Sequence, residues 1–205
     1  SLEYCGAVSQ LLTLSQGLIE RDYDVHVCTF HHHAPREMEF AAAGVPIVIV
    51  PRRWRLDPMA DWQLARHVRR LKPNVVHTWN TAPGMFGPLA ARCPLVAGYY
   101  HINRYKPGWE WAIDRRFARR AGHLVTNSEA VRGWCVQNGL PAVRLAVIRS
   151  GLASARPSDI SREALLSKLG LPPNARLVGV VGQLIPEKRV KDLIWAGDLL
   201  RVLHG

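Results

Sequence analysis

The chain has 205 residues, of which 48% are hydrophobic and 21% are charged, and its formal net charge is +11. This composition excludes a disordered or fibrous protein, and the longest apolar runs fall short of the roughly 20 residues that a membrane-spanning helix needs. The positive charge favours anionic partners such as nucleotide phosphates, an anionic membrane face or nucleic acid, but it does not choose among them. The four cysteines lack zinc-site spacing, which indicates reduced thiols in the cytosol.

Helix and strand patterns alternate along the first 150 residues. The first helix is predicted at residues 10–20, and no strand pattern precedes it. Further helices are predicted at 36–43, 58–71, 83–92, 109–121 and 128–138, and strands at 25–30, 46–50, 75–78, 95–100, 124–126 and 145–148. This order predicts an α/β fold with a doubly wound, Rossmann-like parallel sheet, whose ligands bind beyond the carboxyl ends of the strands. Candidate binding segments therefore follow the strands, at 31–33, 52–55, 78–81, 100–104 and 127–129.

Residues 151–205 differ in composition from the first 150 residues. Glycine, proline and serine in residues 151–175 surround one short predicted helix at 162–169. We expect a linker here, between a first domain at 1–150 that lacks its first strand and a second Rossmann-like domain, truncated, at 176–205. The apolar run 177–181 predicts a buried strand, and residues from Lys188 onward predict a helix. Strand, tight turn and helix start together suit a phosphate, because free N–H groups and a lysine face the turn.

Five segments in order resemble GT-B-fold glycosyltransferases of family 4. The stretch LLTLSQGLIERDYDVHV at 11–27 is similar to the family's first helix and second strand, and PNVVHT at 73–78 is similar to the strand often written D-V-V-H. The stretch LVTNSEAV at 124–131 resembles the end of the first domain, AVIRSG at 146–151 occupies the place of the V-I-P-N-G linker, and VVGQLIPEK at 180–188 resembles V-G-R-L-x-x-x-K. The resemblance covers nearly the whole chain.

The resemblance implies that the parent protein is an enzyme, a hexosyltransferase-like glycosyltransferase that retains anomeric configuration. The donor substrate would be a nucleotide-diphosphate sugar bound mainly by the second domain, with no cofactor and no metal. The expected acceptor is a glycan or a lipid-linked sugar in cell-surface polysaccharide or glycolipid synthesis. The 205 residues alone are expected to be inactive, since half of the donor cleft would be missing.

The resemblance also implies candidate site residues. His101, directly after a predicted strand, would be the catalytic residue that reaches the donor sugar, and Arg104 lies on the same loop. Lys188 would neutralise the donor diphosphate, with Gly182 and Gln183 in the same turn. A histidine satisfied at a strand end, an exposed first-turn lysine and a solvated loop arginine are the alternative interpretations.

Some positions depart from the family pattern. In the glycine-rich entry loop, Gly6 is kept for donor binding, but Val8 stands where the family has an acidic residue. Gln183 replaces the diphosphate-binding arginine, and Ser150 replaces an asparagine at the linker. The adjacent histidines at 31–33 do not converge as ligands, so no metal site is predicted.

A membrane contact is a further option. Trp109, Trp111 and Phe117 alternate with arginines in the helix predicted at 109–121, as in helices that rest on anionic lipids, although core packing is the alternative. We expect a cytoplasmic protein, with peripheral contact at the inner face of the membrane as an option and no specific nucleic acid partner. Two other functions stay open: a non-catalytic α/β module that binds an anionic partner, and a GT-B sugar-nucleotide epimerase. The donor sugar, its base, the acceptor and the oligomeric state are not specified by the sequence.

Overall fold

The computed structural model describes residues 2, 5–30, 35–54, 57–79, 93–103, 106–152, 159–182, 184 and 186–204. The chain divides into two units, residues 1–153 and residues 154–205. The histidines at 31–33, the helix predicted at 83–92, Arg104 and Gln183 lie outside the described residues.

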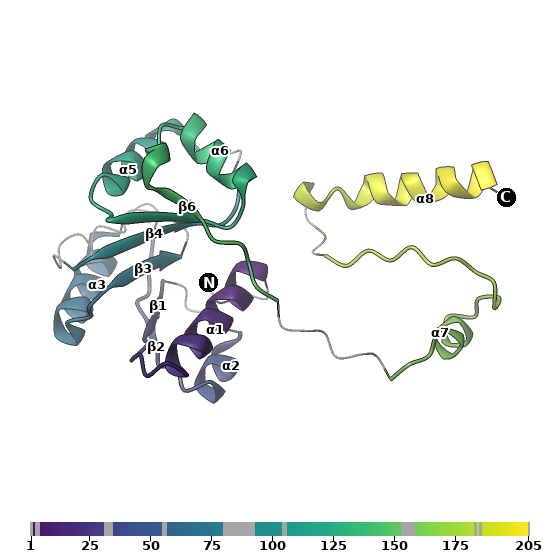
Figure 1. The fold of residues 1–205 in the computed structure, drawn as a ribbon, viewed down its shortest axis with the longest axis horizontal. Helices are drawn as coiled ribbons and strands as arrows, with labels where there is room; N and C mark the ends of the chain where they lie inside the picture. The colour runs from purple at the N-terminus through teal and green to yellow at the C-terminus, as the bar shows by residue number, and fades with distance from the viewer. Residues whose placement is uncertain are drawn as a thin grey trace. The chain divides into compact units, whose positions relative to one another are not determined.

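The described strands of the first unit form two parallel sheets (Figure 1). In the smaller sheet, β1 (Val27–Thr29) pairs with β2 (Ile47–Ile49). The larger sheet has the order β3 (Val76–Trp79), β4 (Leu95–Tyr99), β5 (His123–Thr126) and β6 (Leu145–Val147). Every described pair is parallel, which confirms the prediction of a parallel α/β fold.

Helices connect and cover these strands. They are α1 (Gly6–Ile19), α2 (Glu37–Ala42), α3 (Pro58–Leu71), α5 (Gly108–Ala118) and α6 (Glu129–Gln137), followed by a 3-10 turn at Ala142–Arg144. The bounds of α3 are those predicted, whereas α1 begins four residues earlier than predicted. Ser128, the first residue of the helix predicted at 128–138, is the N-cap of α6, because the backbone N–H of Val131 donates to its Oγ at 3.2 Å.

The start of α3 shows why this stretch is helical. Asp57 is the N-cap, and its carboxylate accepts from the backbone N–H groups of Met59 at 3.0 Å and Ala60 at 3.3 Å. Pro58 then occupies the first helical position, where no N–H is needed. At the other end Lys72 adopts the left-handed conformation with φ 48° and terminates the helix.

One face of the larger sheet builds the main core. Leu95, Ala97 and Tyr99 alternate along β4 and share a buried cluster with residues of α5 and α6. Trp111 is only 5% exposed and Phe117 only 4%, so the core interpretation of these aromatics is confirmed. Two of the three aromatic side chains that suggested the optional membrane contact of this helix are thus inside the protein, and Trp109 is exposed.

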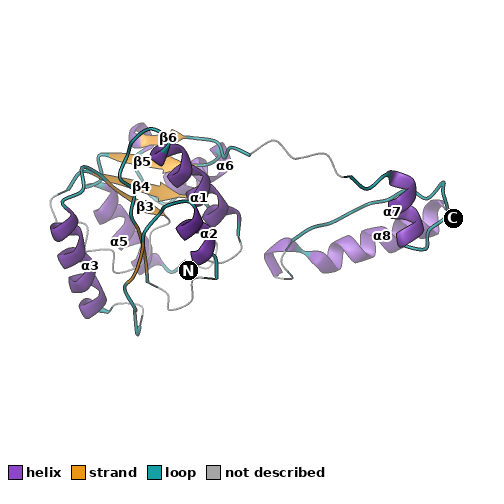
Figure 2. Ribbon diagram, turned by 90° about the horizontal axis from the view of Figure 1, so that it is seen from below, coloured by secondary structure: helices purple, strands orange, loops and turns teal. Residues whose placement is uncertain are grey.

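The second unit contains α7 (Arg162–Lys168), a 3-10 turn at Pro186–Lys188 and α8 (Val190–His204). The helix predicted from Lys188 is present, but the strand predicted at 177–181 is not: residues 175–181 are loop (Figure 2). A strand needs a neighbour to satisfy its N–H and C=O groups, and no strand pair involves the described residues of this unit. The side chain of Val181 is fully exposed.

Candidate functional site

The carboxyl ends of β3, β4 and β5 meet at one edge of the larger sheet, because the strands are parallel and paired in order. The first turn of α1 lies at the same edge. The indole Nε1 of Trp79, the last residue of β3, donates to the backbone carbonyl of Ala7 at 2.9 Å. This contact joins residues 72 positions apart and brings the start of α1 to the predicted ligand-binding edge.

Three aromatic side chains form a cluster on one face of this edge. The strand register pairs His77 with Val96 and Trp79 with Gly98, so these residues and Tyr100 share a face. The rings of Trp79 and Tyr100 lie 4.2 Å apart between centroids, and His77 Nε2 is 2.9 Å from the Tyr100 hydroxyl. Gly98 makes room for this arrangement, since a Cβ there would collide with the Tyr100 ring.

The His77–Tyr100 contact joins two neutral groups at neutral pH. Loss of hydration lowers the pKa of His77, although its ring reaches solvent, and burial raises the pKa of Tyr100 well above its usual range. One group donates and the other accepts, and neither carries a charge. His77 therefore contributes an uncharged hydrogen-bonding group to this edge of the sheet.

His101 follows Tyr100 directly, and the backbone before it is held in place. Asn127, which follows β5, donates from Nδ2 to the carbonyl oxygen of Tyr100 at 3.0 Å. Partial desolvation, followed by the nearby charge of Lys106, lowers the pKa of His101. The exposed imidazole is therefore neutral near pH 7 and can both donate and accept a hydrogen bond.

A buried ion pair anchors the segment after His101. Lys106 Nζ pairs with a carboxylate oxygen of Asp114 in α5, and both side chains are buried. The ammonium also lies 4.7 Å from the centre of the Trp111 ring. The backbone N–H of Lys106 donates to the carbonyl of Asn103 at 3.2 Å, which closes a turn. Lys106 thus holds the loop onto the core.

Gly6 is the first residue of α1 and is exposed. A Cβ at this position would meet nothing within 4 Å, so packing does not require glycine there. Val8, which stands where an acidic residue was expected, is buried with Val27 and Phe40 and serves the core of the smaller sheet. One turn on, Gln10 Nε2 donates to the carbonyl of Gly151 at 2.5 Å, which places the end of the first unit beside α1.

In the second unit, the turn brings Gly182 and Lys188 together. A Cβ on Gly182 would lie 3.9 Å from Lys188 Cγ, and both residues are exposed. Lys188 ends the 3-10 turn just before α8, and Arg189 between them has φ 51°. Lys188 thus lies two residues before a 15-residue helix, whose start carries unpaired backbone N–H groups.

Sequence reasoning pointed to the segments after the strands but did not identify the contacts of Trp79, Tyr100 and Asn127. These side chains lie in or next to the candidate segments 78–81, 100–104 and 127–129. Their position after consecutive strands was the available signal. Their hydrogen bonds depend on strand register, which the sequence pattern does not specify.

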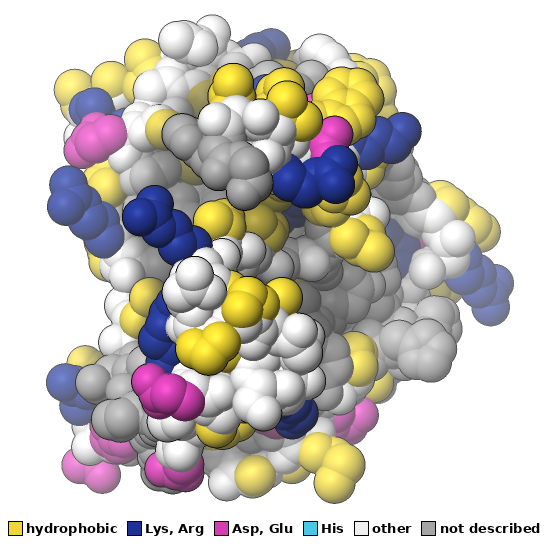
Figure 3. Space-filling view, turned by 90° about the vertical axis from the view of Figure 1, so that its right-hand side faces the viewer, with side chains coloured by type: hydrophobic (Ala, Val, Ile, Leu, Met, Phe, Trp, Pro, Cys, Tyr) yellow, Lys and Arg dark blue, Asp and Glu magenta, His cyan; other side chains and the backbone are white. Residues whose placement is uncertain are grey.

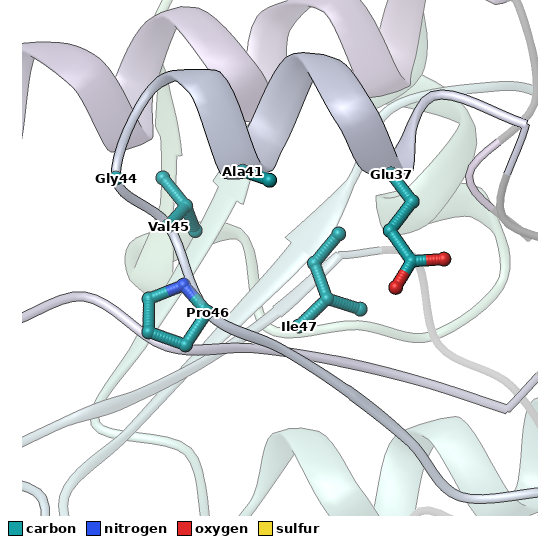
Figure 4. Close-up of a pocket in the computed structure, with 6 residues that line it drawn as sticks. All are labelled: Glu37, Ala41, Gly44, Val45, Pro46 and Ile47. Atoms are coloured by element: carbon teal, nitrogen blue, oxygen red, sulfur yellow. The ribbon is translucent and has the colours of Figure 1, made fainter.

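A pocket of about 280 Å³ lies elsewhere in the first unit (Figure 4). It is lined by Glu37, Ala41, Gly44, Val45, Pro46 and Ile47, between α2 and the amino end of β2. Ligands of parallel sheets bind at the carboxyl ends instead. Since Glu37 is the only charged residue among the described residues that line it, we do not assign this pocket to the site.

The surface of the chain is both basic and apolar. Figure 3 shows that both Lys or Arg side chains and hydrophobic side chains are exposed at the surface. Among the described residues, no group of three or more His, Cys, Asp or Glu side chains is placed to hold a metal ion. No helix in the described ranges has both the length and the apolar character to cross a bilayer.

The chain is similar to known proteins in both sequence and fold. The family model for Glycosyltransferase Family 4 matches residues 4–156. The fold is similar to that of Anabaena Alr3699/HepE, crystallised with UDP, at a TM-score of 0.68 and 20% identity over 83% of this chain and 48% of that one. The complex of the same protein with UDP-glucose gives a TM-score of 0.67 at 20% identity, with the same coverage of both chains.

A glycosyltransferase from Rickettsia africae ESF-5 is also similar, at a TM-score of 0.59 and 13% identity over 84% of this chain and 48% of that one. The chain therefore spans about half the length of these solved structures. No curated protein matches it.

Proposed function

This chain belongs to glycosyltransferase family 4, and on that premise we propose that its parent enzyme transfers a sugar from a nucleotide-diphosphate donor to an acceptor, with retention of anomeric configuration. The observation that carries the proposal is the strand-end site of the first unit. There, a neutral His101 projects from a loop held by Asn127 and by the buried Lys106–Asp114 pair.

The choice of nucleotide rests on the structural neighbours. Anabaena Alr3699/HepE was crystallised with UDP and with UDP-glucose. We propose a uridine diphosphate sugar as the donor of the parent enzyme. The 20% identity supports this choice through the shared fold alone.

Each proposed role follows from the chemistry of its group. The neutral imidazole of His101 would bind a donor-sugar hydroxyl, which requires one ring nitrogen free to accept or donate. The Lys188 ammonium, beside Gly182 and the start of α8, would stabilise the negative charge that grows on the leaving diphosphate. The exposed Gly6 at the start of α1 would let a ligand approach the first N–H groups.

The same proposal assigns the parts of the chain, the acceptor and the location of the enzyme. Residues 1–150 would form the acceptor-side domain, 151–175 the linker, and 176–205 the start of the donor-binding domain. A glycan or lipid-linked sugar would be the acceptor, on the cytoplasmic side of the membrane, and no cofactor would be needed. Arg104 and Gln183 stay candidates for donor binding from the sequence.

Lys188→Ala tests the donor role in the full-length parent. We expect this change to weaken UDP binding about tenfold in calorimetry, since a full charge beside the diphosphate is lost. Lys191→Ala is the matched control, because Lys191 is an exposed lysine at the second position of α8, three residues after Lys188. Its affinity should stay within about twofold of the unaltered protein.

His101→Ala separates binding from chemistry in the same assay. Sugar transfer should fall by about a hundredfold or more, while UDP affinity should stay unchanged, because His101 is assigned to the sugar and not to the diphosphate. Absence of binding for every nucleoside diphosphate would refute the proposal and favour a non-catalytic module. Epimerised nucleotide sugar as the product, without transfer, would favour an epimerase.

A further inference from the structure

The outer face of α3 combines large apolar and basic side chains. The inner face of this helix is packed against the protein through Ala60, Leu64, Ala65 and Val68. The outward positions, which recur at helical spacing, hold Met59, Trp62, Arg66, Arg69 and Arg70. The helix therefore already has a buried face, and its opposite face is amphipathic along its length.

The apolar part of this face is exposed. Met59 is 59% exposed and Trp62 is 53% exposed, and with Pro58 they line a shallow apolar hollow. Burying apolar side chains of this size stabilises a fold, because their surface is removed from water. Met59 and Trp62 do not stabilise the fold by burial, because other residues of α3 form the face that packs against the protein. An apolar patch of this kind is typical of a contact surface.

The basic part lies next to it. The guanidinium of Arg66 is 5.5 Å from the centre of the Trp62 ring, and Arg70 follows about one turn later, also exposed. None of the outward positions of α3 carries an acidic residue. Asp61, the one acidic residue within the helix, is mostly buried and lies 3.5 Å from Arg52. The field of this face is therefore positive.

We propose that Met59, Trp62, Arg66 and Arg70, here called the α3 surface, bind an anionic membrane surface. Charge complementarity selects this occupant: arginines attract lipid phosphates, and a tryptophan with a methionine suits the boundary between headgroups and acyl chains. The helix would lie flat on the bilayer, because its other face is packed against the protein. The inference stands apart from the proposed transfer reaction, since it uses none of the site residues.

Helix α5 differs from α3 in which of its apolar side chains are exposed. Helix α5 carries Arg115 and Arg116, is followed by Arg119 and Arg120, and was the membrane candidate in the sequence. However, Trp111 and Phe117 of α5 are buried, and Arg115 donates to the carbonyl of Asn138 at 3.2 Å. Of the three aromatic side chains of α5, Trp109 stays exposed, at 47%. The α3 surface differs because Met59 and Trp62 together line an apolar hollow beside Arg66, which suits a lipid surface better than a polyanion without apolar groups.

Vesicle co-sedimentation of the 205-residue chain tests the proposal. We expect binding to vesicles of phosphatidylcholine mixed with phosphatidylglycerol, and little binding to phosphatidylcholine alone. Arg66→Glu with Arg70→Glu should lower the vesicle affinity at least about tenfold, because each basic residue near the surface contributes about 1 kcal/mol. Arg116→Glu in α5 with Arg120→Glu just after the helix is the matched control, with the same charge change at exposed arginines. It should lower the affinity less than about threefold.

A second measurement does not depend on charge reversal. Lipids brominated along the acyl chain should quench part of the tryptophan fluorescence of the bound chain, and this part should disappear in Trp62→Ser but not in Trp109→Ser on α5. Circular dichroism would show whether each variant is folded. If the Arg66→Glu, Arg70→Glu variant is unfolded, Arg66→Gln with Arg70→Gln would be measured in its place.

Three outcomes would overturn the proposal: equal loss of affinity in the α3 and α5 variants, unchanged quenching in Trp62→Ser, or equal binding to both kinds of vesicle. Tighter binding to a nucleic acid duplex than to anionic vesicles, lost in the same α3 variants, would assign the surface to nucleic acid instead.

Discussion

Similar apolar sequences form a strand in the first unit of the chain and a loop in the second. In the first unit, Leu95–Tyr99 is a strand with a partner on each side, and its alternate side chains are buried beneath α5 and α6. In the second unit, the equally apolar residues 177–181 form a loop with exposed side chains. The difference teaches that an apolar run becomes a strand only when neighbouring strands take up its backbone N–H and C=O groups.

The ion pairs of the two units show the same contrast and give the largest expected effect. Lys106→Met in the first unit should destabilise the fold by about 3–5 kcal/mol, because it removes one member of a buried ion pair. Arg201→Met in the second unit removes the exposed pair with Asp198 and should cost less than about 1 kcal/mol. Urea unfolding followed by near-ultraviolet circular dichroism measures both.

The double change Lys106→Met with Asp114→Leu is the control for this prediction. Replacing both charges by apolar groups should recover most of the lost stability, since the cost arises from a single uncompensated charge. An equal loss in the single and double variants would show that shape, and not charge, holds this loop.

Removal of one leucine from each unit gives the next largest effect. Leu124→Ala in β5 should cost about 2–5 kcal/mol, because the side chain is fully buried and leaves a cavity. Leu203→Ala in α8 should change the stability by less than about 0.5 kcal/mol, because that side chain is mostly exposed. Similar losses in thermal unfolding at the two positions would contradict the contrast between the units.

The smallest effect concerns matched serine N-caps. Ser128→Ala at α6 should cost about 1 kcal/mol, because the hydrogen bond from Val131 is lost from a helix that belongs to the core. Ser161 makes the equivalent bond with Ala164 at the start of the seven-residue α7. Ser161→Ala should leave the main unfolding transition unchanged and should only lower the local protection of α7 in hydrogen exchange. A shift of the main transition would mean that the two units unfold together.

The α/β fold and most of its elements could be predicted from the sequence. Helical periodicity, Ser128 as a cap and Pro58 as the first helical residue are local signals, and the structure agrees with them within a few residues. The strand at 177–181 could not be excluded in this way, because strand formation depends on partners that are distant in sequence.

The site was predictable in outline but not in its contacts. The order of the elements indicated that ligands bind after the strands, and the family-like segments drew attention to His101 and Lys188. The contact between His77 and Tyr100 spans 23 residues, and that between Asn127 and Tyr100 spans 27. Such pairs arise from the register of neighbouring strands, and nothing in a local pattern encodes that register.

The sequence by itself determined the alternation of helices and strands, the positive charge and the membership of a family, because each is carried by local composition or by segments in order. Only the tertiary structure decided which aromatic and basic side chains are inside. Trp111 and Lys106 became parts of the core, while Trp62 and Arg66 stayed outside on α3. The reason is physical: burial depends on what packs against a helix face, and helical spacing specifies only which residues share that face.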